Sequence, residues 1–357
     1  MQIICVGDLC CDLIVPYGKM LDALARGDIR KEVTDQMQVR MQCGGSVGNV
    51  ARHLGQMKAK PVFITPVGQD PLGEFLSSEM EKKGVDMRWA APSARSNMYC
   101  VAVMDQSGER TMFCFVPPWA DFPRFDESSF GAIPEYSDQI LFTSGMAMLE
   151  DAKNNAAVLD FFAMRKKSGA LIVFDLNVRA ESYGYEGERK ASMEKMIALS
   201  DIVLGSGSDE FSQVTGEARI RDAAARLLDR GARTVIARDG GEPILILGKG
   251  LGGSGKVRGE SGEIDCHESS GKYEGLGNSG KCERVGNSGK REGLGNSGKR
   301  ESLDEYVPVK PVKPVSTLGA GDSFDAMFLQ CIASGYDIRE AVRKASDYAG
   351  DYISGRK

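Results

Sequence analysis

The chain has 357 residues, 42% of them hydrophobic, which suffices for one large α/β domain or two smaller domains with a substantial core. Its net charge of −5 argues against a nucleic-acid or anionic-membrane surface as the main function and favours small soluble ligands. The nine cysteines are scattered without paired C-x-x-C spacing, which favours a reducing cytoplasm and argues against a zinc site.

The apolar N-terminus, Met1–Val15, is interrupted by Asp8 and Asp12 and shows neither a basic leader nor a cleavage site. We therefore expect a strand there and no signal peptide. Within this stretch, Gln2–Val6 ends at Gly7 and Asp8, which is typical of a buried strand whose carboxyl end carries functional groups. No apolar window is long enough to predict a membrane helix.

A glycine pair, Gly44-Gly45, precedes the next helical pattern. From Val47 to Leu54 apolar residues recur at i, i+3, i+4 and i+7, which predicts a helix within 44–56. A strand at 61–66 and an amphipathic helix at 72–83, closed by Gly84, are expected to follow.

Three further segments, residues 36–42, 97–105 and 110–115, alternate polar and apolar side chains or are rich in β-forming residues. Residues 106–109 (QSGE) have the composition of a hairpin turn between the last two. We expect a small antiparallel sheet beside the main domain, with one face buried.

From residue 139 onward, predicted strands and helices alternate. We expect strands at 139–142, 170–175, 201–204 and 234–237, and helices near 152–167, 188–199, 220–230, 323–330 and 338–353. Repeated units of this length predict a mostly parallel sheet with helices on both faces.

Residues 248–305 differ in character from the rest of the chain. They are rich in glycine, and a nonapeptide recurs from Gly275 onward (GLGNSGKCE, RVGNSGKRE, GLGNSGKRE). Apolar residues are too few to offset the entropy of ordering, so we interpret this stretch as a flexible insertion. Its G-x-x-x-x-G-K matches lack the Ser/Thr and the preceding strand of a P-loop. The repeats also lack the spaced aspartates of calcium-binding repeats, and their balanced charge argues against nucleic-acid binding.

The most informative stretch is residues 316–324 (STLGAGDSF). Gly319, Ala320 and Gly321 let the backbone approach an anion closely, and their N–H groups can face phosphate oxygens at a helix start. Asp322 is the candidate general base beside them. On this pattern alone, a glycine turn capped by an aspartate is an equally good interpretation.

Two motifs together resemble those of the ribokinase-like (PfkB) family of carbohydrate kinases. Residues 44–55 (G-G-x-x-x-N-x-A, then L-G) resemble the family's first hallmark motif, and residues 317–322 (T-x-G-A-G-D) resemble the second. Their order and separation also suit that family. The resemblance covers nearly the whole chain apart from the insertion.

The resemblance implies an α/β fold in one kinase domain over residues 1–357: a three-layer, Rossmann-like, mostly parallel sheet and a small β-sheet lid at about 13–42 and 94–118. It implies ATP-dependent phosphorylation of a hydroxymethyl group on a sugar or nucleoside. Asp322 matches the base that takes the proton from the attacking hydroxyl. The implied anion hole and ATP-binding residues are Thr317, Gly319, Ala320 and Gly321.

The resemblance also assigns substrate binding to Asp12, Gly44, Gly45, Asn49 and Asn177. Asn177 belongs to a D-x-N-x-R segment at residues 175–179. Glu210 matches the glutamate of the family's N-x-x-E motif, which organises Mg²⁺ through water. A helix-surface amide is the alternative interpretation of Asn49, and a capped turn at a strand end is that of Asn177.

The chain departs from the family pattern at several positions. Gly207 replaces the asparagine of N-x-x-E, Ser316 replaces the aspartate that opens the second motif, and the insertion immediately precedes that motif. The chain ends soon after the helix at 338–353, so we expect the elements that flank adenine to be curtailed. Because Asp322 is retained, an active sugar kinase is favoured over an impaired sugar-binding protein on the same fold. A nucleoside kinase is the third interpretation.

The implied cofactors are ATP and Mg²⁺, with a monovalent cation as an optional addition. We expect a small-molecule sugar as the partner, no nucleic acid and no membrane, a cytoplasmic location, and a homodimer through the lid. Arg40, Arg95 and Arg110 are the candidates for contacting a phosphorylated substrate.

Overall fold

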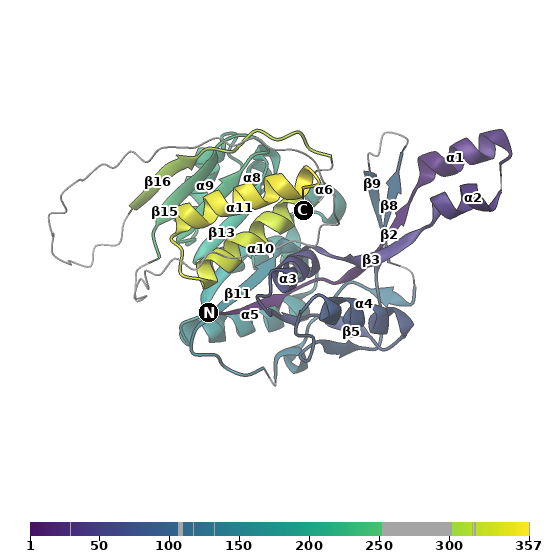
Figure 1. Ribbon diagram of the computed structural model, residues 1–357. Coiled ribbons are helices and arrows are strands. Elements are labelled where there is room, and N and C mark those ends of the chain that lie inside the picture. Colours follow the sequence, from purple (N-terminus) through teal and green to yellow (C-terminus); the bar gives the residue numbers. More distant parts are fainter. Residues whose placement is uncertain are drawn as a thin grey trace, which may run out of the picture.

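An eight-stranded mixed sheet forms the centre of the molecule in the computed structural model, with strand order β16-β15-β14-β13-β12-β11-β1-β4 (Figure 1). The structure describes residues 1–28, 30–105, 110–116, 118–131, 133–251, 302–315, 317 and 319–356. The parallel strands are β4 (Val62–Ile64), β1 (Gln2–Val6), β11 (Gln139–Ser144), β12 (Leu171–Asp175), β13 (Ile202–Ser206) and β14 (Thr234–Arg238). Antiparallel pairing then adds β15 (Ile244–Lys249) and β16 (Ser302–Val307).

Helices cover both faces of this sheet, as the alternating pattern predicts. One apolar cluster packs side chains of α3 (Ser46–Gln56), α4 (Pro71–Lys82), α10 (Ala320–Ala333) and α11 (Ile338–Ile353) against one face. A second cluster packs α5 (Ala152–Lys167), α7 (Gly187–Leu199), α8 (Ser208–Thr215) and α9 (Ile220–Asp229) against the other face. The expected three-layer α/β architecture is therefore confirmed.

A smaller four-stranded sheet, here called the lid sheet, projects from the main domain (Figure 1). Its order is β3 (Arg40–Gly44), β2 (Cys10–Val15), β8 (Tyr99–Met104) and β9 (Arg110–Phe115). The pairing of β2 with β8 is parallel, and the two outer pairings are antiparallel. Beyond the strands extend α1 (Tyr17–Arg26), α2 (Lys31–Thr34) and the 3₁₀ turn η1 (Asp35–Met37).

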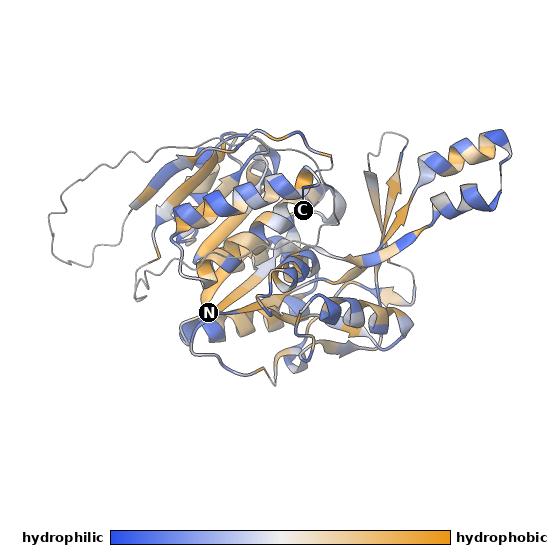
Figure 2. Cartoon of the chain, in the orientation of Figure 1, coloured by the Kyte–Doolittle hydropathy of each residue, from blue (hydrophilic) through white to orange (hydrophobic). Residues whose placement is uncertain are grey.

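Short elements complete the connections. Two parallel strand pairs join β5 (Pro66–Gly68) to β6 (Ala91–Ser93) and β7 (Ser96–Asn97) to β10 (Ala120–Asp121). The remaining elements are η2 (Glu127–Phe130), η3 (Gly145–Ala147) and α6 (Ala180–Tyr183). Coloured by hydropathy, the central strands are largely apolar and the outer faces of the helices are polar (Figure 2).

Several local predictions need correction. The N-terminal stretch holds two strands in different sheets, because the chain turns at Asp8, whose carboxylate is bound by the start of α3. Of the expected 36–42 segment, only residues 40–42 lie in a strand, which is β3 and continues to Gly44; residues 35–37 form a 3₁₀ turn. The lid helix α1 was not predicted, and the strand expected at 61–66 is divided between β4 and β5. The hairpin turn 106–109 and most of the insertion lie outside the described residues.

None of the helices in the described part of the chain is long and apolar enough to span a bilayer.

Candidate active site

The second glycine motif forms the start of α10, as its sequence predicts. Gly319 caps the helix with φ +76°, a left-handed conformation that favours glycine, and a Cβ there would lie 3.3 Å from the ring of Tyr352. The N–H groups of the following turn, including those of Gly321 and Asp322, belong to the helix end where amides have no intrahelical acceptor. This end of α10 is therefore suited to an anion.

Asp322 brings the two glycine motifs together. Asn49 Nδ2 on α3 donates to Asp322 Oδ2 at 2.9 Å, and Ser46 Oγ donates to Oδ1 at 3.4 Å. Asn177, which follows β12, donates to Ser46 Oγ at 2.6 Å. Asn49 thus contacts Asp322 directly, and Ser46 links Asp322 to Asn177.

The pKa of Asp322 is raised to about 7. Burial is the main cause, and the negative charges of Asp175 and Asp8 add to it. The hydrogen bond from Asn49 and the charge of Arg179 act in the opposite direction. A carboxylate with a pKa near neutrality matches the requirement for a general base.

The first glycine pair leaves room for two aspartates. Asp8 accepts hydrogen bonds from the amides of Ser46 (2.7 Å) and Val47 (3.1 Å) at the start of α3. Gly45 has φ +92°, and a Cβ on it would lie 2.6 Å from the Asp8 carbonyl oxygen. A Cβ on Gly44 would lie 2.1 Å from Asp12 Oδ1, so Asp12 requires glycine at this position.

Asp12 lies on β2 of the lid sheet, apart from the hydrogen-bonded group around Asp322. Its carboxylate accepts from Cys10 Sγ at 3.5 Å and from the Gln42 side chain. Burial raises its pKa, and Asp8 raises it further. Asp8 raises the pKa of Asp322 as well, so its charge acts on both carboxylates.

The segment after β12 has a strained backbone. Asn177 (φ +31°) and Arg179 (φ +46°) are two of the four non-glycine residues with positive φ in the described chain. Arg179 Nε donates to Asn177 Oδ1 at 2.8 Å, which stabilises this conformation. Such strain is typical of functional sites and argues against an ordinary capped turn.

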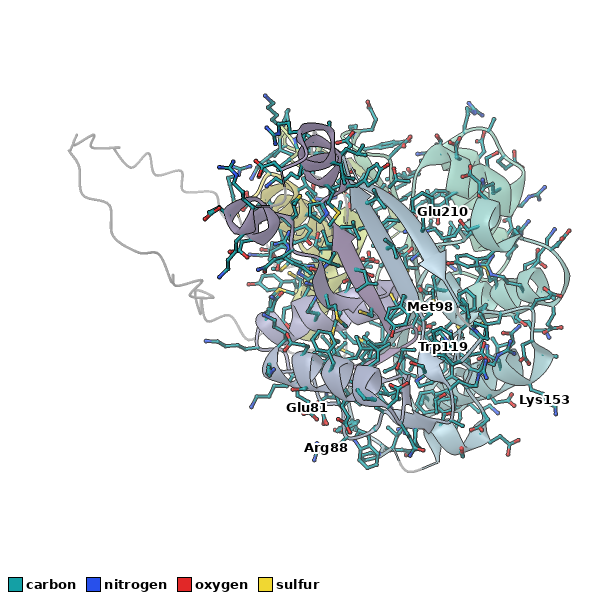
Figure 3. All side chains as sticks on the ribbon, turned by 90° about the vertical axis from the view of Figure 1, so that its right-hand side faces the viewer. Glu81, Arg88, Met98, Trp119, Lys153 and Glu210 are labelled. Carbon is teal, nitrogen blue, oxygen red and sulfur yellow. The ribbon has the colours of Figure 1, made fainter. Side chains whose placement is uncertain are left out.

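Glu210, the candidate metal-site residue, lies on α8 of the main domain. Figure 3 labels it in a view onto the lid strands. Its two oxygens accept from the amides of Val178 (2.9 Å) and Ser206 (2.7 Å). Burial and the charge of Asp175 raise its pKa to about 7. Gly207, which stands where the family motif has asparagine, has φ +92°, so glycine suits this backbone.

The acidic donor set is compatible with Mg²⁺. Carboxylates and waters are the ligands that this ion prefers, and Glu210 retains lone pairs beside its two backbone contacts. A cation between Glu210 and Asp175 would relieve the repulsion that raises the Glu210 pKa.

A buried arginine, Arg238 at the end of β14, connects the strand ends to α10. It donates to Asp325 Oδ1 (2.7 Å), to Asp175 Oδ2 (3.2 Å) and to the carbonyl oxygens of Gly321 (3.2 Å) and Gly205 (3.2 Å). Burial lowers the pKa of Arg238, but the neighbouring carboxylates outweigh this effect and raise it. Arg238 therefore fixes the first turn of α10 against β12 and β13.

Four residues of this arrangement were not among the predicted site residues: Asp8, Ser46, Arg238 and Asp325. The signal for Asp8 and Arg238 was a charged residue directly after or at the end of an apolar strand. Ser46 lies within the first motif and Asp325 lies three residues after the second, but a single sequence does not show which of these positions face the site.

The remaining predicted residues have peripheral positions. Thr317 is exposed and its carbonyl accepts from Ala320 N at 3.2 Å, whereas Ser316 lies outside the described residues. Arg95 donates to the carbonyl oxygens of Pro118 and Ala120, and Arg40 is exposed on β3.

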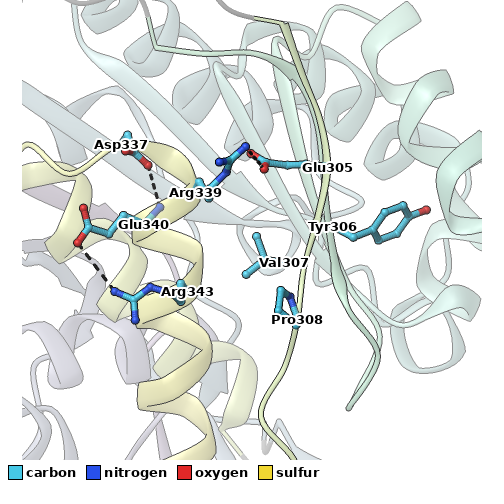
Figure 4. A pocket seen from close by; sticks show the side chains of 8 residues that line it. All are labelled: Glu305, Tyr306, Val307, Pro308, Asp337, Arg339, Glu340 and Arg343. Carbon is cyan, nitrogen blue, oxygen red and sulfur yellow. Dashed lines mark hydrogen bonds and ion pairs between the residues drawn. The ribbon is translucent and has the colours of Figure 1, made fainter. Parts of the chain in front are cut away.

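A cavity of about 470 Å³ lies between β16 and the start of α11 (Figure 4). Its lining is mainly charged: Glu305, Asp337, Arg339, Glu340 and Arg343. No predicted site residue lines it, so its size gives no support for a role in the chemistry argued from Asp322.

The chain matches a known family over most of its length. The family model described as "pfkB family carbohydrate kinase" matches residues 2–259 and 295–354. Aminoimidazole riboside kinase of Salmonella typhimurium is 25% identical over 217 residues, covering 60% of this chain and 66% of that protein. A 5-dehydro-2-deoxygluconokinase of Clostridium perfringens is 24% identical over 233 residues, covering 64% of this chain and 68% of that protein. The matched region thus spans about two thirds of these relatives.

The fold matches solved kinase structures. Fructokinase from Vibrio cholerae, in a form with bound fructose, ADP and calcium ion, aligns with a TM-score of 0.69 at 21% identity. The alignment covers 99% of this chain and 93% of that one. This similarity shows a shared fold, which is ribokinase-like.

Proposed function

The chain belongs to the pfkB family of carbohydrate kinases, and we propose that it transfers the γ-phosphoryl group of ATP to a hydroxymethyl group of a sugar or sugar-like substrate. One observation carries the proposal: Asp322, with a pKa near 7, stands at the anion-binding start of α10 and is held by Asn49 from the other motif.

Each residue has a defined part in the proposed reaction. Asp322 takes the proton of the substrate hydroxyl as that oxygen attacks phosphorus. The N–H groups of the turn from Gly319 to Asp322 stabilise the negative charge on the transferring phosphoryl group. Thr317 lies at the entrance to this turn, where we place the nucleotide.

The substrate side is proposed to consist of Asp12, Gly44, Gly45, Asn49 and Asn177. Asp12 binds sugar hydroxyls through its carboxylate, and Gly44 leaves room for that carboxylate. Asn49 has its amide committed to Asp322 and its oxygen to Arg52 at 2.9 Å, so we assign it mainly to orienting the base.

Glu210, with Asp175 beside it, would hold Mg²⁺ through water. The ion, when bound, neutralises phosphate charge.

The substrates of similar proteins limit the classes of acceptor that we consider. The matches include an aminoimidazole riboside kinase, a 5-dehydro-2-deoxygluconokinase and a structure with bound fructose. We propose a sugar as the acceptor of this chain, and a nucleoside is the outcome that would revise it. The seven cysteines in the described part of the chain are free thiols, which supports a cytoplasmic location.

The test is ADP release with Mg²⁺-ATP against a panel of ketoses, aldoses, sugar acids and nucleosides. Asp322→Asn should lower turnover by about 10²- to 10⁴-fold, the usual contribution of a general base. Asp151→Asn is the matched control, because Asp151 caps α5 on the other face of the sheet and asparagine also serves as a cap. If folded wild-type protein binds a sugar but releases no ADP, the chain is the impaired sugar-binding protein and the proposal is wrong.

A further inference from the structure

Two buried thiols and a carboxylate meet in the lid sheet, and a third, exposed thiol lies beside one of them. Cys10 and Asp12 on β2 and Cys100 on β8 are buried, and their potential ligand atoms all lie within 4.8 Å of one another. Cys114 is directly opposite Cys100 on β9, with 2.8 Å between the two sulfurs. These cysteines are far apart in the sequence, and the pairing of β2 with β8 and of β8 with β9 brings them together.

Two distances within this group match those of a tetrahedral metal site. With metal–sulfur and metal–oxygen bonds of about 2.3 and 2.1 Å, tetrahedral geometry places two sulfurs about 3.8 Å apart and a sulfur and an oxygen about 3.6 Å apart. The Cys10 and Cys100 sulfurs are 3.8 Å apart, and Cys10 Sγ lies 3.5 Å from Asp12 Oδ1. Cys114 supplies a fourth donor after its sulfur moves about 1 Å away from that of Cys100.

The surroundings resemble the outer shell of a metal site. The Gln42 side chain is hydrogen-bonded to the Asp12 carboxylate, and the Tyr183 side chain is hydrogen-bonded to Cys114. Such partners fix the orientation of ligands. Met98 (Figure 3) and Phe122 pack against Cys10 and Cys100 and limit access by water.

We propose that Cys10, Asp12, Cys100 and Cys114 bind one thiophilic divalent cation of the Zn²⁺ class. Sulfur donors select such a cation over Mg²⁺, which prefers oxygen. A regulatory consequence, which rests on the proposed function, is that the cation occupies the carboxylate assigned to the sugar. Metal and substrate therefore compete.

The first experiment uses Co²⁺ as a spectroscopic substitute for Zn²⁺ on the full-length protein, kept in a reductant that does not bind metal. We expect thiolate-to-cobalt charge-transfer bands and the d–d bands of tetrahedral cobalt, saturating near one equivalent and abolished by Zn²⁺. Absence of the bands in folded, fully reduced wild-type protein would overturn the proposal, whether or not the protein is a kinase.

Variants locate the site. Cys100→Ser should weaken metal affinity by at least about 100-fold, the upper value for losing an outer-shell partner. Cys331→Ser is the matched control, because this buried thiol lies on α10 beside Met327 and should leave the spectrum unchanged. If both variants lose the bands equally, or if neither does, the assignment is wrong.

The competition is measured separately. A sugar that the protein phosphorylates should displace cobalt from the wild type, and Zn²⁺ should raise its KM in the wild type but not in Cys100→Ser. If such a sugar leaves cobalt bound, the proposed competition is wrong and the metal site itself still stands. If no substrate is found, the result counts against the proposed function instead.

Discussion

Asp322 is one of several carboxylates that share a small, partly buried region, and its neighbours set its acidity. Asp175 and Asp8 raise its pKa by charge repulsion, while Asn49 lowers it by hydrogen bonding to the ionised form. The resulting value of about 7 means that the base is only partly ionised at neutral pH. The proposed activity should therefore depend on pH in the physiological range.

We predict that kcat/KM of the free enzyme rises with pH through about 7, because only ionised Asp322 accepts a proton. Asn49→Leu removes a hydrogen bond that favours the ionised form, so its profile should move to higher pH by about one unit, the equivalent of a charged hydrogen bond. The measurement is kcat/KM from pH 5.5 to 9 with the substrate found by the panel. A profile that is unchanged in the variant would contradict this role of Asn49.

Arg238 shows a second effect at the residue scale. We predict that Arg238→Met lowers the free energy of unfolding by about 3–5 kcal/mol at pH 7.5, because Asp175 and Asp325 remain buried without their cation. The loss should be smaller at pH 5.5, where the orphaned Asp325, whose pKa burial raises, can be protonated. Urea unfolding at both pH values measures it.

Arg165→Met is the control for this prediction. Arg165 is also buried, but its guanidinium donates to the carbonyl oxygens of Ile133 and Pro134, which do not titrate. The loss in free energy of unfolding caused by Arg165→Met should thus be the same at the two pH values. If the loss in free energy of unfolding caused by Arg238→Met is also independent of pH, then lost packing explains the effect and unpaired charge does not.

At the scale of elements, the regular parts of the fold were predictable. Helices α5 and α11 have the predicted bounds. Asp151 and Asp337 are good N-caps for them, and the buried residues of α11 recur at helical spacing. Helix α1 was missed since it lies within a segment assigned to the lid strands and packs few residues into a core. The change of sheet between β1 and β2 depends on hydrogen bonds from α3 to Asp8, which no local pattern reveals.

The site was predictable to the extent that it lies in the two motifs. The family resemblance assigned both Asn49 and Asp322 to the site, but it did not predict the hydrogen bond between them. The contacts of Arg238 and the thiol cluster around Cys100 arise from strand order and register, which one sequence does not determine.

Helix α3 offers a test at this scale, because it packs on α11 through a buried histidine. His53 lies edge-on to the ring of Tyr352, with centroids 4.9 Å apart, and its Nδ1 is 3.4 Å from the Tyr348 hydroxyl. Burial, with a smaller effect of Arg52, lowers the His53 pKa to about 4. The folded state thus holds a neutral ring, whereas the unfolded chain takes up a proton below its usual pKa of 6.5.

We predict that stability is lost as pH falls from 6.5 towards 4, and that His53 accounts for about 2 kcal/mol of the loss by pH 5. His53→Leu should be less stable than wild type at pH 7.5, with the difference shrinking or reversing at pH 5. Urea unfolding of both proteins at the two pH values provides the comparison, since other titrating groups affect them alike. A constant difference would mean that His53 is protonated in the folded state.

At the scale of the whole molecule, exposed apolar side chains gather on the lid sheet and its helices, whereas the main domain exposes few. Nine of the 13 exposed large hydrophobic side chains in the described chain lie there or in the adjoining connections: Tyr17, Leu21, Leu24, Val39, Met41, Met112, Phe113, Val116 and Trp119. In Figure 2 the lid strands carry apolar stretches, and α1 alternates between apolar and hydrophilic colouring. A surface of this kind is typical of an interface between proteins.

We predict a homodimer formed through the lid sheets, because a twofold contact buries the same apolar surface on both copies. Phe113→Asp, at a side chain that is 49% exposed on β9, should convert the dimer to a monomer by placing two charges in the interface. Light scattering with size-exclusion chromatography measures the mass. Val315→Asp is the control, since Val315 is 78% exposed but outside the lid, and it should remain dimeric. A wild-type monomer at the highest concentration, or equal dissociation of both variants, would contradict a lid interface.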